Sequence, residues 1–185
     1  AINIVVNDPN TNVVTPAELQ AVMDAIAKLN NAEANASDTI DADDLETLGI
    51  TGTNGLSVDE IAAVNEAINA EGLNITNNPA ALQTLVDSLE DVVAGTVDAT
   101  DLTNIGVTNP ASVDIAAINA VLQDSDTNVD DTSEVQAVDD AIAKLNNGEA
   151  NNNSSLTSTD LETIGITGTA GISVNEKTTG KETKQ

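Results

Sequence analysis

The chain has 185 residues, of which 31 are acidic and five are Lys, so its formal net charge is −26. It contains no Cys, His, Arg or aromatic residue. It therefore lacks thiol and imidazole nucleophiles, the soft ligands of zinc and haem sites, and the side chains that hold nucleic acid. We expect neither an enzyme nor a nucleic-acid-binding protein, and no apolar run is long enough to insert into a membrane.

The opening segment, AINIVVNDPNTNV, contains a β-branched run that by itself is typical of a strand. It aligns without gaps with AINAVLQDSDTNV, 116 residues later, where the pattern is the end of an Ala-rich helix. Over residues 1–60 and 117–176, 36 of 60 positions are identical. Residues 2–6 are therefore predicted to be helical, and residues 1–14 to be the tail of a preceding unit.

The next segment is predicted to be a helix that starts at a capping box formed by Thr15 and Glu18. Apolar residues then recur at the spacing of one helical face. The residues expected on this inward stripe are Leu19, Val22, Met23, Ile26 and Leu29. At the third turn of the later copy the stripe carries Asp139, which predicts that one edge of the stripe reaches water.

A short second helix is predicted from Asp41, its N-cap, to Gly49, a left-handed C-cap, with Leu45 and Leu48 inward. The motif around it recurs as DLETLGITGT at Asp44, DLTNIGVTNP at Asp101 and DLETIGITGT at Asp160. The corresponding caps are Asp98 with Gly106, and Thr157 with Gly165.

A third helix is predicted to start at Ser57 with Glu60 in the capping-box position. The residues expected to be buried on it are Val58, Ile61, Val64 and Ile68. Asn65 and its counterpart Asn119 lie one residue off this stripe. We expect them on a solvated flank; the alternative is a buried Asn that fixes the register.

These patterns predict an all-α fold, an elongated tandem array of about three three-helix units of roughly 58 residues each. The predicted divisions are a tail of a preceding unit (1–14), repeat unit 1 (15–78), repeat unit 2 (79–131), a truncated repeat unit 3 (132–176) and a disordered basic tail (177–185).

Two linkers have the oxygen spacing of an EF-hand loop, EANASDTIDADD and EANNNSSLTSTD, which makes Ca²⁺ the candidate ligand. The candidate ligands are Glu33, Asn35, Ser37, Asp41 and Asp44 in the first, and Glu149, Asn151, Asn153, Thr157 and Asp160 in the second. The central Gly and the final bidentate Glu of an EF-hand are missing, and the middle unit lacks the ligands. The competing interpretation is that these residues only cap the second helix.

A further linker, DSDTNVDD, alternates oxygen-bearing side chains that suit Ca²⁺. Its candidate ligands are Asp124, Asp126, Asn128 and Asp130. The alternative is structural, because Asp131 fits the N-cap of the helix that follows, with Glu134 completing the box.

The motifs DLETLGITG, LSVDEIAAVNEAI and AELQAVMDAI together resemble the helical tandem repeats of large bacterial surface proteins, the RTX-type or biofilm-associated adhesins. The resemblance covers residues 1–176 and fails in the Lys-rich end, KTTGKETKQ. It implies secretion to the bacterial cell surface and a role in extending adhesive domains. It provides no ligand motif that matches residues of this chain.

The expected function is therefore a non-catalytic stalk or spacer segment of an extracellular adhesin. Its expected partners are neighbouring repeats of the same chain and an unknown host or surface ligand. The alternative is an adhesion module that recognises a protein or glycan, with or without calcium. Against it, the chain has no aromatic residue or Arg to form the hot spots of an interface.

Overall fold

The computed structural model describes residues 2–34, 39–54, 56–69, 79–108, 110, 114–125, 127, 129, 131–151 and 156–169, with the side chains of 148–151 left aside. The described residues form helices and no strand, so the predicted all-α class is confirmed. The helices are α1 (Ile2–Val6), α2 (Pro16–Ala34), α3 (Ala42–Thr47), α4 (Val58–Asn69), α5 (Pro79–Ala94), α6 (Ala99–Asn104), α7 (Ile115–Leu122), α8 (Thr132–Asn151) and α9 (Ser158–Thr163).

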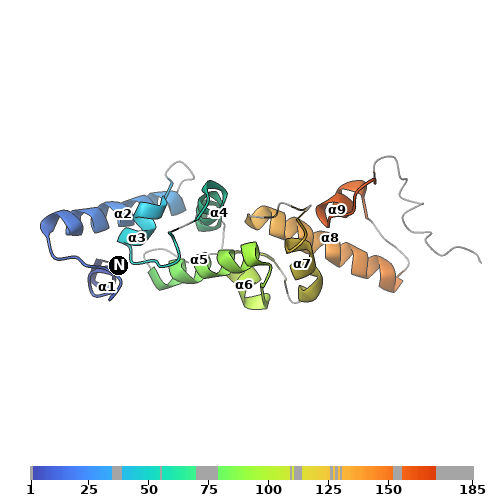
Figure 1. The fold of residues 1–185 in the computed structure, drawn as a ribbon, viewed down its shortest axis with the longest axis horizontal. Helices are drawn as coiled ribbons and strands as arrows, with labels where there is room; N and C mark the ends of the chain where they lie inside the picture. Colours follow the sequence, from blue (N-terminus) through green and yellow to red (C-terminus); the bar gives the residue numbers. More distant parts are fainter. Residues whose placement is uncertain are drawn as a thin grey trace, which may run out of the picture.

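The helices follow one another along the long axis of an extended molecule, with α1 to α3 at one end and α8 and α9 at the other (Figure 1). Packing is local in sequence. Each long helix packs against the short helix that follows it: α2 against α3, α5 against α6 and α8 against α9. Helix α4 contacts α2, α5 and α8, and α7 contacts α5 and α8. The prediction that Ile2–Val6 is helical is also confirmed.

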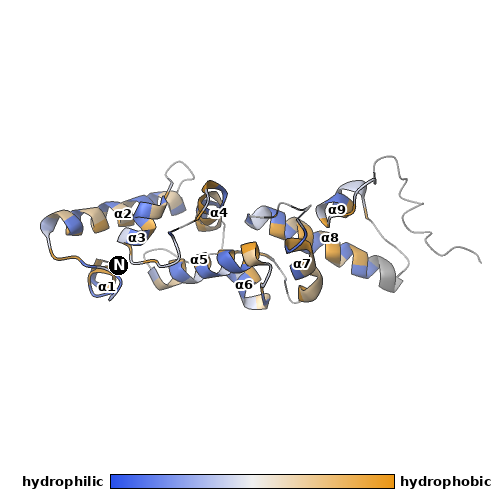
Figure 2. Cartoon of the chain, in the orientation of Figure 1, coloured by the Kyte–Doolittle hydropathy of each residue, from blue (hydrophilic) through white to orange (hydrophobic). Residues whose placement is uncertain are grey.

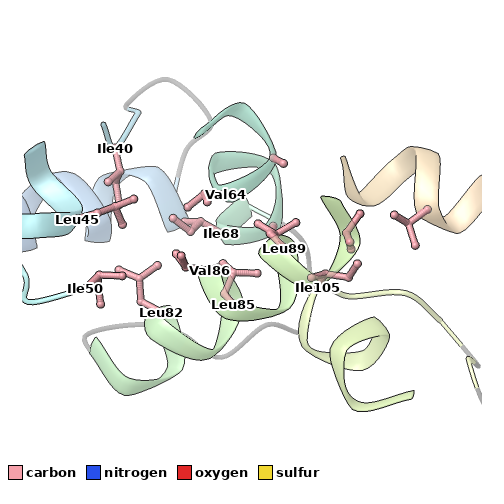
Figure 3. Close-up of a cluster of buried hydrophobic side chains, with 14 of the residues drawn as sticks. Ile40, Leu45, Ile50, Val64, Ile68, Leu82, Leu85, Val86, Leu89 and Ile105 are labelled. Atoms are coloured by element: carbon pink, nitrogen blue, oxygen red, sulfur yellow. The ribbon is translucent and has the colours of Figure 1, made fainter. Parts of the chain in front are cut away.

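The long helices α2, α5 and α8 carry both apolar and polar residues along their length (Figure 2). The apolar sides meet in one core of aliphatic side chains, which extends from Val5 to Ile142. Figure 3 shows part of it, where Ile50 after α3 points toward Leu82 of α5, and Val64 and Ile68 of α4 lie beside Val86. Because no side chain in the chain is aromatic, this core is built from small and medium aliphatic groups.

The three short helices have six residues each, too few to be stable alone. Both of their ends are therefore capped. Each N-terminus has a capping box, with Asp41, Asp98 or Thr157 at the N-cap. At each C-terminus a Gly has a positive φ, for example 83° at Gly49 and 91° at Gly106. The residue after each Gly donates its N–H five residues back, as in a Schellman motif.

The expected inward stripes are partly wrong. Val58 is among the most exposed large apolar residues, because it lies at the first position of α4, before the stripe meets α2. Leu19 and Met23 are also exposed, since no described helix covers that side of α2. The remaining residues of the first stripe, Val22, Ile26 and Leu29, are buried as predicted.

Candidate functional site

The first candidate loop is only partly described. Asn35 and Ser37 lie outside the described residues. Glu33 lies in the last turn of α2 and is half-buried, while Asp41 and Asp44 lie at the start of α3. The two Asp residues are thus close together, with Asp44 buried and Asp41 exposed.

Asp44 is held by both the helix end and a cation. Its Oδ2 accepts the backbone N–H of Asp41 at 3.2 Å, which completes the capping box. Its two oxygens accept hydrogen bonds from Lys28 Nζ at 2.9 and 2.7 Å. The pKa of Asp41 is lowered. The main cause is the hydrogen bond that its carboxylate accepts from the backbone N–H of Asp44, and the positive charge of Lys28 adds to it. The bond to Asp44 raises the pKa of Lys28.

The second candidate loop repeats this arrangement. Lys144 contacts Asp160, whose other oxygen accepts the N–H and hydroxyl of Thr157 at 2.6 and 2.7 Å. Burial disfavours the charged form of Asp160, but the bonds from Lys144 and Thr157 outweigh it and lower its pKa. Glu149 and Asn151 lie within α8, where only the backbone is described, and Asn153 lies outside the described residues.

The middle copy replaces the ion pair by neutral donors. Asp101 occupies the place of Asp44, and its Oδ1 accepts the hydroxyl of Ser88 on α5 at 3.1 Å. Ser88 in turn accepts the side-chain amide of Asn104 at 3.0 Å. Asp101 Oδ2 accepts the backbone N–H of Asp98 at 2.8 Å. In all three copies, therefore, a long-helix side chain holds the acidic residue of the short helix.

This chemistry satisfies the carboxylates without a metal. In two copies an ammonium group lies where a bound cation would have to contact Asp44 or Asp160. Among the residues that the structure describes, no three His, Cys, Asp or Glu are placed to hold a metal ion. Several candidate ligands fall outside those residues, so calcium binding stays a prediction. The capping roles of Asp41, Asp44, Thr157 and Asp160 are confirmed.

The third candidate linker is only partly described. Asp126, Asn128 and Asp130 lie outside the described residues, whereas the Asp124 carboxylate lies beside Gly165, 3.2 Å from where a Cβ on that residue would be. The aligned Asp8 lies in the same way beside Gly49. A Cβ on Gly49 would come within 2.9 Å of the Thr11 side chain. The absence of a side chain at Gly49 therefore also leaves room for the segment that contains Asp8 and Thr11.

The predicted capping role of Asp131 is confirmed, because its Oδ1 accepts the N–H of Glu134 at 2.8 Å. The start of α8 is strongly acidic. Glu66 of α4 lies near this helix start. The pKa of Glu66 is raised, mainly by burial and next by the negative charge of Asp131.

The predicted solvated flank of α4 is wrong at Asn65, which is buried. Its Oδ1 accepts the N–H of Ile40 and its Nδ2 donates to the Ile40 carbonyl, each at 2.8 Å. On α7, Asn119 donates to the carbonyl of Val97 at 3.0 Å. Both amides fix the residue before a short helix. The sequence signal for this contact was the recurrence of Asn at the aligned positions of α4 and α7.

A second amide contact links successive helix groups and was not predicted. Gln83 of α5 accepts the N–H of Thr51 at 2.8 Å and donates to its carbonyl at 3.1 Å. Gln136 of α8 accepts the N–H of Thr108 at 2.8 Å. The signal was in the sequence, where Gln recurs at this position of each first helix as AELQ, AALQ and SEVQ.

Asp139 was expected to mark an edge of the apolar stripe that reaches water, and this expectation is wrong. Asp139 is 3% exposed, and its Oδ1 has no hydrogen-bond partner. Helix α8 packs against α4, α7 and α9, whereas α2 lacks such a cover on the side of Met23. Burial, and then the charge of Asp140, raise the pKa of Asp139 to about 6.

One hollow lies between the turn before α2 and the segment after α3, lined by Asn10, Glu46 and residues 49–54. It is open to solvent and contains one acidic side chain. Within the described part of the chain no helix is long and apolar enough to cross a membrane. Comparison of the chain with protein-family models, curated proteins and solved structures finds no match.

Proposed function

We propose that this chain is a non-catalytic structural segment of a secreted bacterial cell-surface adhesin, in which tandem three-helix units act as a stalk or spacer. Two observations support the proposal. The sequence motifs resemble the helical repeats of such adhesins, and the contacts of the structure recur at the spacing of the sequence repeat.

The contacts that recur within a unit join its three helices. The Lys28–Asp44 pair of the first copy reappears as Lys144–Asp160, 116 residues later in the numbering. The amide of Asn65 that holds the segment before α3 has a counterpart on α7, which holds the segment before α6. The first two units are thus each fixed by polar contacts of their own, as well as by the shared apolar core.

The observation that carries the proposal is the contact between units. Gln83 of one unit binds the backbone of Thr51 in the preceding unit, and Gln136 binds Thr108 at the next junction. Each contact lies beside aliphatic residues of the same core. Two successive junctions with the same chemistry produce an array that extends in one direction, as in other solenoid-like proteins. The extended shape in Figure 1 agrees with this.

The test alters length and surface separately in the full surface protein. Deleting residues 15–130 removes two units and joins residues that align in the repeat, so the register is kept. If the chain is a spacer, we expect the shortened protein still to be exported. We also expect the distance between the cell surface and the adhesive end, its reach, to decrease. The length-preserving control replaces exposed Asp43 and Asp59 by Asn, and should leave reach and adhesion unchanged.

The alternative function makes the opposite prediction. If the chain itself recognises a protein or glycan, the purified 185-residue chain should bind an array of such ligands, and surface substitutions should weaken adhesion at full length. Binding by the isolated chain, or a protein that never reaches the cell surface, would overturn the spacer proposal.

A further inference from the structure

The helix contacts that join successive units are built alike at two places inside the chain. At the first, which we call the α5 junction, α4 packs against α5. At the second, the α8 junction, α7 packs against α8. A Gln crosses each junction and accepts the backbone N–H of a Thr at 2.8 Å: Gln83 accepts from Thr51, and Gln136 accepts from Thr108. The two junctions can therefore be compared position by position.

The position three residues after each Gln differs in its chemistry. In α5 it is Val86, which is fully buried. Figure 3 shows Val86 beside Val64 and Ile68 of α4, so its surroundings at the α5 junction are aliphatic. An uncharged methyl-bearing side chain suits this place at every pH.

At the α8 junction the same position is Asp139, which is only 3% exposed. The residues of α7 that align with Val64 and Ile68 are Ile118 and Leu122, so the facing helix is aliphatic here too. Asp139 Oδ1 has no hydrogen-bond partner. A carboxyl group thus occupies a place that the other junction fills with an aliphatic side chain.

The charged groups around Asp139 give it no cation. Helix α7 carries no titratable residue. The acids of α4 are Asp59, Glu60 and Glu66, and those of α9 are Asp160 and Glu162. All of them have the sign that opposes ionisation of Asp139.

The same holds on α8 itself. The negative charge of Asp140 acts directly on Asp139, and Glu134 near the helix start is also acidic. The Lys of this helix, Lys144, is bound to Asp160. An ionised Asp139 would therefore be both desolvated and repelled as long as the α8 junction stays packed.

We infer that the α8 junction is a proton-dependent contact, which stays packed while Asp139 is protonated and separates locally when Asp139 ionises, whereas the α5 junction does not respond to pH. The inference rests on the proposed tandem array, because it concerns the contact between successive units. It adds a position at which such an array opens first.

The size of the effect follows from the proton affinity of Asp139. Burial, and then the charge of Asp140, raise its pKa from 3.8 to about 6. When α8 separates, the carboxyl meets water and its pKa returns toward the ordinary value. The packed form then holds a proton that the separated form has released, so separation gains as pH rises through this window. Between pH 5 and pH 7.5 the ratio of separated to packed forms should rise about tenfold.

The experiment measures hydrogen exchange of two backbone amides by NMR in the intact chain. The N–H groups of Thr51 and Thr108 are each donated across one junction, so each is released when that junction separates. Dividing by the exchange rate of the unstructured chain at the same pH gives a protection factor. For Thr108 it should fall about tenfold between pH 5 and pH 7.5. For Thr51 it should stay constant.

Reciprocal substitutions move the device from one junction to the other. Asp139→Val gives the α8 junction the residue of the α5 junction and should remove the pH dependence at Thr108. Val86→Asp should confer that dependence on Thr51, and far-UV circular dichroism at pH 5 verifies that this variant is folded. Asp24→Asn, at an exposed carboxyl, controls for the loss of one negative charge, and Thr108 should keep its pH dependence in it.

Three results would overturn the inference. They are a protection factor of Thr108 that does not change with pH, an equal fall at Thr51, and a fall at Thr108 that persists in Asp139→Val. The last two need no Val86→Asp protein, so the test holds even if that variant does not fold. Small-angle scattering at pH 5 tests the proposed function separately. An elongated chain whose Thr108 ignores pH leaves the spacer proposal standing and removes only the proton-dependent contact.

Discussion

The buried carboxyl of Asp139 makes the stability of this protein depend on pH in a way that one substitution can isolate. Asp139 is nearly inaccessible, and its pKa rises from 3.8 to about 6. Asp139→Asn removes the ionisable group with almost no change of shape. We expect this variant to be more stable than the intact chain at neutral pH and about equally stable at pH 4.

The magnitude follows from the difference between the folded and unfolded pKa values of Asp139. Between pH 3.8 and 6 the folded protein binds a proton at Asp139 that the unfolded chain has released. Stability must therefore fall as pH rises through this window. A tenfold change in proton affinity corresponds to about 1.4 kcal/mol, so the ionised carboxyl destabilises the folded state by about 3 kcal/mol above pH 7. This is a large part of the stability of a typical domain.

The assay is urea unfolding followed by far-UV circular dichroism between pH 4 and pH 8. The quantity of interest is the difference in unfolding free energy between Asp139→Asn and the intact chain, because the overall charge changes with pH in both. Asp24→Asn, at an exposed carboxyl of α2, is the control for the loss of one negative charge. A difference for Asp139→Asn that is the same at every pH would refute the reasoning.

Three further measurements address the caps, the buried amide and calcium. Gly106→Ala should cost about 1 kcal/mol in urea unfolding, because Gly106 has a φ of 91°; an unchanged midpoint would contradict the cap. Asn65→Ala should cost about 2 kcal/mol, because it leaves two buried backbone groups unpaired, and more than Asn119→Ala, for which one bond is lost. If the first two linkers bind Ca²⁺, millimolar CaCl₂ should raise the melting temperature above that in NaCl of equal ionic strength. Asp44→Ala with Asp160→Ala should abolish that gain, whereas equal curves in the intact chain would leave these carboxylates as caps and ion-pair partners.

The helix ends could be predicted from the sequence because capping is local. The N-cap of α3 depends on Asp41 and the residue three positions later, and its C-cap on Gly49 and the aliphatic residue that follows. The helical state of Ile2–Val6 contradicts its local propensity for a strand. It was predicted correctly only because the internal alignment supplied a second copy in a clearer context.

Burial could not be predicted from one helix at a time. Met23 and Asp139 occupy aligned positions, yet the apolar residue is exposed and the acidic one is buried. Hydropathy alone predicts the reverse. What decides is which other helices lie over that side, and α8 packs against α4, α7 and α9. Asn65 was misplaced for a related reason, because its partner Ile40 is 25 residues away.

The charge of the chain and its extended shape are physically connected. A compact body with a net charge of −26 would bring many carboxylates within mutual range, and that repulsion opposes folding. In an extended molecule the carboxylates near opposite ends lie much farther apart than the screening length, about 8 Å at physiological ionic strength. Several of the remaining acids are placed at helix N-termini, where the helix dipole favours them. An extended shape therefore confines most of the repulsion to carboxylates that are close neighbours, so the electrostatic cost of folding is lower than in a compact body of the same charge.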